Sequence, residues 1–104
     1  MLKNILKNIK PTSEKELIDV LLKDENILIE HIVSYGFPSP EGIWYNQEKK
    51  EWVVLLTGKA EIEFKDGTVI KFKAGDYIFI PAHQEHRVIY TSKEPNCIWL
   101  AFHF

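Results

Sequence analysis

From residue 51 to its end, the chain alternates short apolar runs with turn residues. In 60–64, apolar and charged side chains alternate with the period of two that a half-buried strand shows, and the Asp66-Gly67 pair that follows is a strong hairpin signal. Strands are expected over 52–56, 60–64, 69–72, 77–80, 87–91 and 98–104. Many short strands at even spacing predict an all-β domain, either a closed barrel or a sandwich.

The first 50 residues carry a more mixed pattern. Ser13 and Glu16 have the spacing of a capping box, and the apolar residues after them share one helical face, which predicts a short helix over 14–22. Branched residues are concentrated in 27–34, which predicts a strand. The prolines and glycines of 35–42 predict a loop.

With 104 residues, the chain is expected to form one domain, 1–104. Its 13 basic and 15 acidic side chains are spread along the sequence, so no basic stripe is present for nucleic acid. No apolar run approaches membrane-spanning length, and the polar N-terminus does not resemble a signal peptide. The single cysteine, Cys97, cannot form a disulfide within the chain. We therefore expect a cytoplasmic protein with no nucleic-acid or membrane partner.

Two of the four histidines, His83 and His86, lie three residues apart between two expected strands. Neutral imidazole is a strong ligand for zinc, iron, nickel or copper, so this turn is a candidate metal site. The alternative is a solvated polar turn, and the spacing alone does not decide between the two.

Further residues place this pair in a family pattern. Gly75, Pro81 and His86 match the second sequence motif of the cupins, in which the histidine binds metal, and Glu51 and Gly58 match the end of the first motif. The chain therefore resembles a small single-domain cupin. The resemblance implies a jelly-roll β-barrel with a metal site formed by both motifs.

The chain departs from the family pattern at three positions. The first cupin motif begins with two histidines, and in the register that we favour their places are taken by Tyr45 and Gln47, which lie on one side of an extended segment and both carry oxygen. In the alternative register the corresponding residues are Trp44 and Asn46. The usual glycine two residues after the proline is His83.

The resemblance implies Gln47, Glu51 and His86 as ligands of a divalent metal ion, which would be iron, manganese, zinc or nickel. His83 is an additional candidate ligand, although strand alternation would turn it away from His86. A neutral amide oxygen adds little affinity, so this site should hold metal less tightly than the full cupin set. No catalytic residue is assigned from the sequence.

Five further residues are expected to line a ligand cavity inside the barrel: Trp44, Tyr45, His31, Trp99 and His103. For each of them the alternative is ordinary core packing.

The resemblance covers about 42–104 and implies a metal-binding cupin acting on a small organic molecule, by dioxygenase-like or isomerase-like chemistry. The alternative is a non-catalytic cupin that binds or senses a small ligand without metal, which the missing histidine pair favours. A homodimer is expected in either case.

Overall fold

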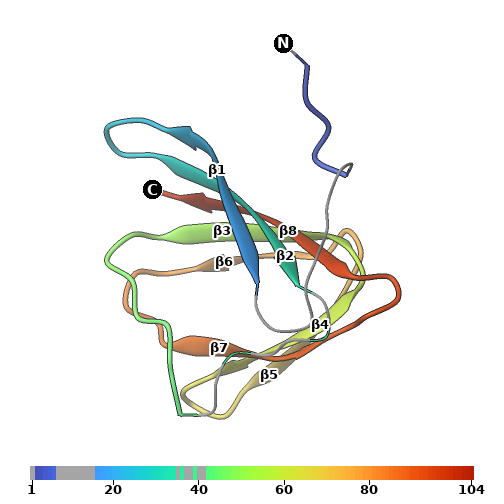
Figure 1. Ribbon diagram of the computed structural model, residues 1–104. Coiled ribbons are helices and arrows are strands. Elements are labelled where there is room, and N and C mark those ends of the chain that lie inside the picture. The colour runs from blue at the N-terminus through green and yellow to red at the C-terminus, as the bar shows by residue number, and fades with distance from the viewer. Residues whose placement is uncertain (1, 7–15, 35, 37–38, 40–41) are drawn as a thin grey trace.

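The computed structural model describes residues 2–6, 16–34, 36, 39 and 42–104. Within these residues the chain forms two antiparallel sheets and no helix (Figure 1). The larger sheet has the order β1 (Leu17–Lys23), β2 (Leu28–Ser34), β8 (Cys97–His103), β3 (Glu51–Thr57), β6 (Tyr77–Ile80). The smaller sheet has the order β5 (Val69–Lys73), β4 (Lys59–Phe64), β7 (His86–Thr91). The predicted all-β jelly roll is confirmed.

Each strand predicted from the sequence is present, and no end differs from the prediction by more than one residue. The helix predicted over 14–22 is wrong for the described part of that range, because residues 17–22 belong to β1; residues 14 and 15 lie outside the described residues. The run from Leu17 to Leu22 carries apolar residues at both odd and even positions, so it also suits a strand. Pairing with β2 decides between the two, as tertiary contacts commonly do for short apolar runs.

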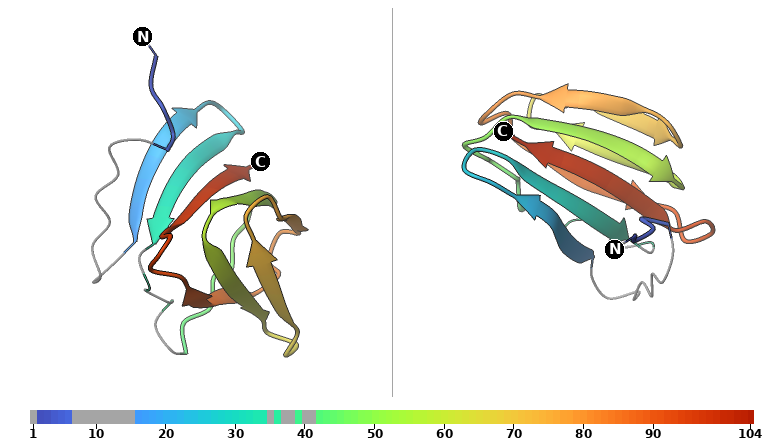
Figure 2. Two further views of the ribbon diagram at one scale, coloured as in Figure 1. Left: turned by 90° about the vertical axis from the view of Figure 1, so that its right-hand side faces the viewer. Right: turned by 90° about the horizontal axis from the view of Figure 1, so that it is seen from above.

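The core lies between the two sheets, where β3, β6 and β8 face β4, β5 and β7 (Figure 2). Its buried apolar members are Val53, Leu55, Ala60, Ile62, Phe64, Phe72, Ile80, Cys97, Trp99 and Ala101. The β1–β2 hairpin lies at one edge of the larger sheet, and β1 is mostly exposed. No helix in the described part of the chain is long and apolar enough to span a membrane.

Strand register brings the two sequence motifs to one end of the sandwich. Glu51 is the first residue of β3 and is paired with Ile80 of β6 and with His103 of β8. His86 is the first residue of β7 and forms an isolated antiparallel bridge with Tyr45. The ends of strands from both sheets therefore surround one point.

Gly58, which follows β3, should tolerate no side chain. Its φ is +86°, and a Cβ built on it would lie 2.8 Å from Oγ of Ser92 and 2.9 Å from the backbone oxygen of Asn96. We expect Gly58→Ala to lower the free energy of unfolding by about 2–4 kcal/mol, combining backbone strain with overpacking. The measurement is urea denaturation followed by tryptophan fluorescence.

The matched control is Gly67→Ala. Gly67 has a φ of +95° but open space around its Cβ position, so this variant should carry only the backbone cost, about 1–2 kcal/mol. Equal losses in the two variants would show that close packing at Gly58 is not important.

Candidate functional site

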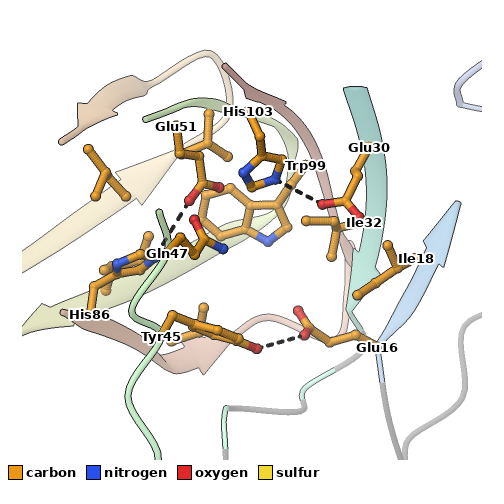
Figure 3. Close-up of a pocket in the computed structure, with 14 residues that line it drawn as sticks. Glu16, Ile18, Glu30, Ile32, Tyr45, Gln47, Glu51, His86, Trp99 and His103 are labelled. Carbon is orange, nitrogen blue, oxygen red and sulfur yellow. Dashed lines mark hydrogen bonds and ion pairs between the residues drawn. The ribbon is translucent and has the colours of Figure 1, made fainter. Parts of the chain in front are cut away.

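A cavity of about 110 Å³ opens between the sheets at the end where the motifs meet (Figure 3). It contains three carboxylates, two imidazoles, one amide and one phenol beside an apolar wall. Its lining residues are Glu16, Ile18, Glu30, Ile32, Tyr45, Gln47, Glu51, Val53, Ile62, Ile80, His86, Val88, Trp99 and His103.

Glu51 and His86 face each other across one side of the cavity. Oε1 of Glu51 lies 3.6 Å from Nε2 of His86, and the two residues are only 7% and 6% exposed. Nδ1–H of His86 donates to the backbone oxygen of Gln84 at 2.9 Å. In the neutral ring this bond leaves the lone pair on Nε2, on the side of Glu51.

Glu51 is held in an unfavourable setting for a carboxylate. Its Oε1 atom is buried and has no hydrogen-bond partner among the described residues. Burial raises the pKa of Glu51 above its ordinary value, and the nearby His103 and His86 partly oppose that rise. An unsatisfied buried acceptor costs about 1–3 kcal/mol, so its retention points to a ligand.

Backbone hydrogen bonds fix the segment that carries Tyr45 and Gln47. The amide of Tyr45 donates to the oxygen of His86 at 2.8 Å, and the amide of His83 donates to the oxygen of Gln47 at 2.8 Å. Both side chains line the cavity, whereas Trp44 and Asn46 do not. The two residues of the favoured register therefore border the cavity, and the two residues of the alternative register do not.

The opposite side of the cavity holds two acidic residues that sequence reasoning missed. Oε1 of Glu30 lies 2.9 Å from Nε2 of His103. Glu16 accepts hydrogen bonds from Ser34 at 3.2 Å and from Tyr45 at 3.4 Å, and burial raises its pKa. Alternation along β2 could have revealed Glu30, whereas the helix assignment concealed Glu16.

Burial also raises the pKa of the Tyr45 hydroxyl, and the neighbouring charge of Glu16 acts in the same direction. The hydroxyl therefore stays protonated at neutral pH and serves as a hydrogen-bond donor. It donates to Glu16 in this structure, and its ring centroid lies 5.7 Å from that of His86.

Three residues that were expected at the site do not line the cavity. His31 is buried on the opposite face of β2, because side chains alternate and Glu30 and Ile32 occupy the cavity face. Trp44 instead contacts the side chains of Lys65 and Arg87, whose Nζ and Cζ atoms lie 4.7 Å and 4.9 Å from its ring centroid.

His83, the third of them, has Nδ1 at 2.9 Å from Oδ1 of Asn46 in an exposed contact. Its φ is +64°, the only positive value at a non-glycine residue in the described part of the chain. The backbone therefore keeps the conformation that suits the usual cupin glycine, although the side chain has changed.

The donor set fits a metal ion only in part. Two ligands bound to one ion at about 2.0–2.2 Å can be at most about 4.4 Å apart, so Glu51 and His86 at 3.6 Å can share an ion. Gln47 offers an amide oxygen beside them. The described residues contain no group of three His, Cys, Asp or Glu side chains placed to hold a metal. Any metal ion at this site would be held by two strong protein ligands, Glu51 and His86.

Together, the two antiparallel sheets and the polar cavity at their end define a small jelly-roll domain with a buried carboxylate–imidazole pair. Residues 37–103 match the family model described as "Cupin domain". The chain belongs to the cupin family. A comparison with curated proteins gives no match.

Three solved structures illustrate the similarity. One is a Ralstonia eutropha protein provisionally assigned as a mannose-6-phosphate isomerase; it is 33% identical, with a TM-score of 0.92 over 99% of this chain and 96% of that chain. A cupin superfamily protein of Desulfitobacterium hafniense is 18% identical, with a TM-score of 0.79 over 92% and 83%. An RmlC-like cupin of Desulfovibrio desulfuricans is 17% identical, with a TM-score of 0.79 over 99% and 95%. The last two show the fold alone.

The raised pKa of Glu51 predicts a pH-dependent stability cost. The pKa of Glu51 in the folded state lies above its ordinary value of 4.5. At pH values between the unfolded-state and the folded-state pKa, the native state therefore binds more protons than the unfolded state, and stability falls as pH rises through this range. Glu51→Gln removes this cost. When both proteins are free of metal, the variant should unfold at a higher temperature than wild type at pH 8. The difference in unfolding temperature should shrink toward pH 4. Thermal unfolding across this range is the measurement.

Glu48→Gln is the control for this prediction, because Glu48 is exposed in the same loop region. It should leave the pH profile unchanged. A Glu51→Gln protein that is less stable than wild type at pH 8 would mean that the carboxylate is stabilised rather than strained.

The backbone at position 83 predicts an unusual order of stabilities. Alanine normally stabilises a position relative to glycine, but a φ of +64° costs a non-glycine residue about 1–2 kcal/mol. His83→Gly should therefore be more stable than His83→Ala by about 1 kcal/mol in chemical denaturation. The reverse order would show that the turn relaxes out of this conformation.

Proposed function

We propose that this cupin binds a divalent metal ion through Glu51 and His86, with Gln47 as a weaker third ligand, and acts on a small organic molecule. The observation that carries the proposal is the unpartnered Oε1 atom of Glu51, which lies 3.6 Å from the Nε2 atom of His86. Two electron-pair donors that face each other across such a gap are stabilised by a cation between them. Iron, manganese, zinc and nickel are all compatible with one imidazole and one carboxylate.

The hydrogen bond from His86 to Gln84 supports the ligand role. It fixes the ring orientation and the tautomer, as the second hydrogen bond of a metal-binding histidine normally does. When bound, the ion would act as a Lewis acid on a substrate oxygen. The hydroxyl of Tyr45 and the imidazole of His103 border the same cavity and are placed to hydrogen-bond the substrate.

The size and the chemistry of the cavity narrow the substrate class. A volume of about 110 Å³ is below the roughly 300–1,000 Å³ of pockets for drug-sized ligands, so the substrate is small. The polar side chains favour a molecule with several hydroxyl or carbonyl groups. The similarity to a provisionally assigned sugar-phosphate isomerase supports isomerase-like over dioxygenase-like chemistry.

A non-catalytic, metal-free binding role is the second candidate. The specific observation in its favour is that Tyr45 and Gln47 line the cavity, where the favoured register of the first cupin motif would have two histidines. The same cavity would then bind its ligand by hydrogen bonds alone. A cytoplasmic location remains a prediction for both candidates.

Metal content separates the two candidates. Untagged protein is stripped with a chelator and reconstituted separately with iron(II), manganese(II), nickel(II) and zinc(II), and bound metal per chain is counted by elemental analysis. We expect close to one ion per chain with at least one metal. Glu51→Gln and His86→Ala should each abolish binding, and Gln47→Ala should weaken it roughly tenfold.

His31→Ala is the control, because His31 is a buried histidine on the other face of the sheet and should leave occupancy unchanged. Failure of the wild-type protein to retain any of the four metals would reject the metal-binding proposal in favour of the second candidate. Unchanged occupancy in both the Glu51 and the His86 variants would place the metal elsewhere.

A further inference from the structure

The three glutamates that line the cavity lie close enough to repel one another. Burial raises the pKa of Glu16 and of Glu51, which lie on opposite sides of the cavity, and the charge of Glu30 adds to the rise in both (Figure 3). None of the described residues that line the cavity is a lysine or an arginine. Ionised carboxylates therefore outnumber positive charges among these residues even when the imidazoles of His86 and His103 are both protonated.

A divalent ion bound by Glu51 and His86 would neutralise only one side of the cavity. Glu16 and Glu30 lie on the other side, directly before β1 and on β2, and are not part of the proposed ligand set (Figure 3). Hydrogen bonds within the described part of the chain use one acceptor site of Glu30 and two of Glu16. An ionised carboxylate has about four such sites, so both residues can accept further hydrogen bonds.

An unpartnered buried atom in the same cavity independently indicates a ligand. Oε1 of Glu51 has no hydrogen-bond partner among the described residues, and the side chain is only 9% exposed. Native proteins rarely leave a buried acceptor without a donor, so a ligand that brings donors or positive charge is expected here.

The wall on the side of β1 and β2 also has an apolar part. Ile18 and Ile32 are paired across the two strands, and this pair lies between Glu30 and Glu16 in the strand register. The side chains of both isoleucines line the cavity. This side of the cavity therefore offers carboxylates to a positively charged group and apolar surface to the carbon atoms that carry it.

We infer that the cavity takes a small molecule with a protonated amine, and that the ammonium group binds on the side of Glu16 and Glu30. The inference rests on the proposed function, because it names the substrate class of the same cavity. Aliphatic amines ionise near pH 10, so they are cationic at neutral pH. An ammonium group has three donors, and its hydrogen bonds to carboxylates are about twice as strong as those between neutral groups.

The same charges select against an anionic substrate. A phosphate monoester carries a charge of about −1.5 to −2 at pH 7, and proteins commonly bind it through arginine, lysine or the N-terminus of a helix. The described part of the chain places none of these on the side of Glu16 and Glu30. An amino alcohol or an amino sugar fits this side of the cavity better than a phosphorylated or carboxylated molecule.

The test compares three probes of equal chain length on chelator-treated protein at pH 7. The probes are 3-aminopropan-1-ol, which is cationic, 1,3-propanediol, which is neutral, and 3-hydroxypropanoate, which is anionic. Affinities are measured by NMR titration of isotope-labelled protein, which detects millimolar binding. We expect the aminopropanol to bind at least tenfold more tightly than the diol, because it gains charge-assisted hydrogen bonds, and the hydroxypropanoate to show no binding.

The variant Glu16→Gln/Glu30→Gln removes both charges with little change in shape. It should weaken binding of the aminopropanol at least tenfold and binding of the diol much less, because only the cation uses these charges. Glu48→Gln is the matched control, since it removes an exposed glutamate that does not line the cavity, and it should leave both affinities unchanged. Circular dichroism checks folding, and the ranking of the probes on wild-type protein tests the inference without any variant.

The inference and the proposed function would fail in different ways. Equal affinity for the aminopropanol and the diol, tighter binding of the hydroxypropanoate, or no binding of the aminopropanol would overturn the inference. Unchanged amine affinity in Glu16→Gln/Glu30→Gln would also overturn it, because the ammonium group would then lie elsewhere. Metal occupancy is measured separately. A protein that retains metal without preferring the amine keeps the proposed function, and one that prefers the amine without retaining metal keeps the inference.

Discussion

The register of β3 is the constraint on which the rest of the structure depends. This strand is paired on both sides, with β6 and β8. Its residues alternate between the cavity side and the outer face, which is the face of the larger sheet that points away from β4, β5 and β7. Glu51 and Val53 face inward, and Trp52 faces outward. A slip of one residue would move Glu51 to the outer face and Trp52 into the cavity. The same backbone hydrogen bonds therefore place Glu51 in the candidate site and Trp52 on the outer face.

The register of β3 places the carboxyl group of Glu51 in a buried position, where an apolar side chain would stabilise the fold more. The cavity gathers Glu16, Glu30 and Glu51, and burial raises the pKa of the first and the last. Hydrogen bonds from Ser34 and Tyr45 satisfy Glu16, and His103 contacts Glu30, whereas one oxygen of Glu51 has no partner among the described residues. Unfavourable groups of this kind concentrate at functional sites, because selection for a ligand can outweigh their cost in stability.

Most strands and part of the cavity could be predicted from the sequence and its resemblance to a family pattern. Alternation and turn residues predict β4 and β5 because each of these strands has one exposed and one buried face. The resemblance to the two cupin motifs points to Glu51 and His86, and alternation favours Tyr45 and Gln47 over their neighbours.

The rest depends on contacts between distant segments. Residues 17–22 suit a helix or a strand, and only the edge of β2 selects the strand. His31 and Glu30 are neighbours on one strand, and which of them faces the cavity follows from the packing of β2 on β8, which no local pattern encodes. Alternation pairs Glu30 with Ile32 on one face of β2, but only this packing shows that the face borders the cavity, and Glu16 was missed because its segment was assigned to a helix.

Strand β1 carries apolar side chains on both faces of the larger sheet. Ile18 lines the cavity, Leu22 belongs to the outer face, and the strand is paired with β2 alone among the described strands. An edge strand with exposed apolar residues on both sides gains little from its own domain, so its position is sensitive to anything that packs against it.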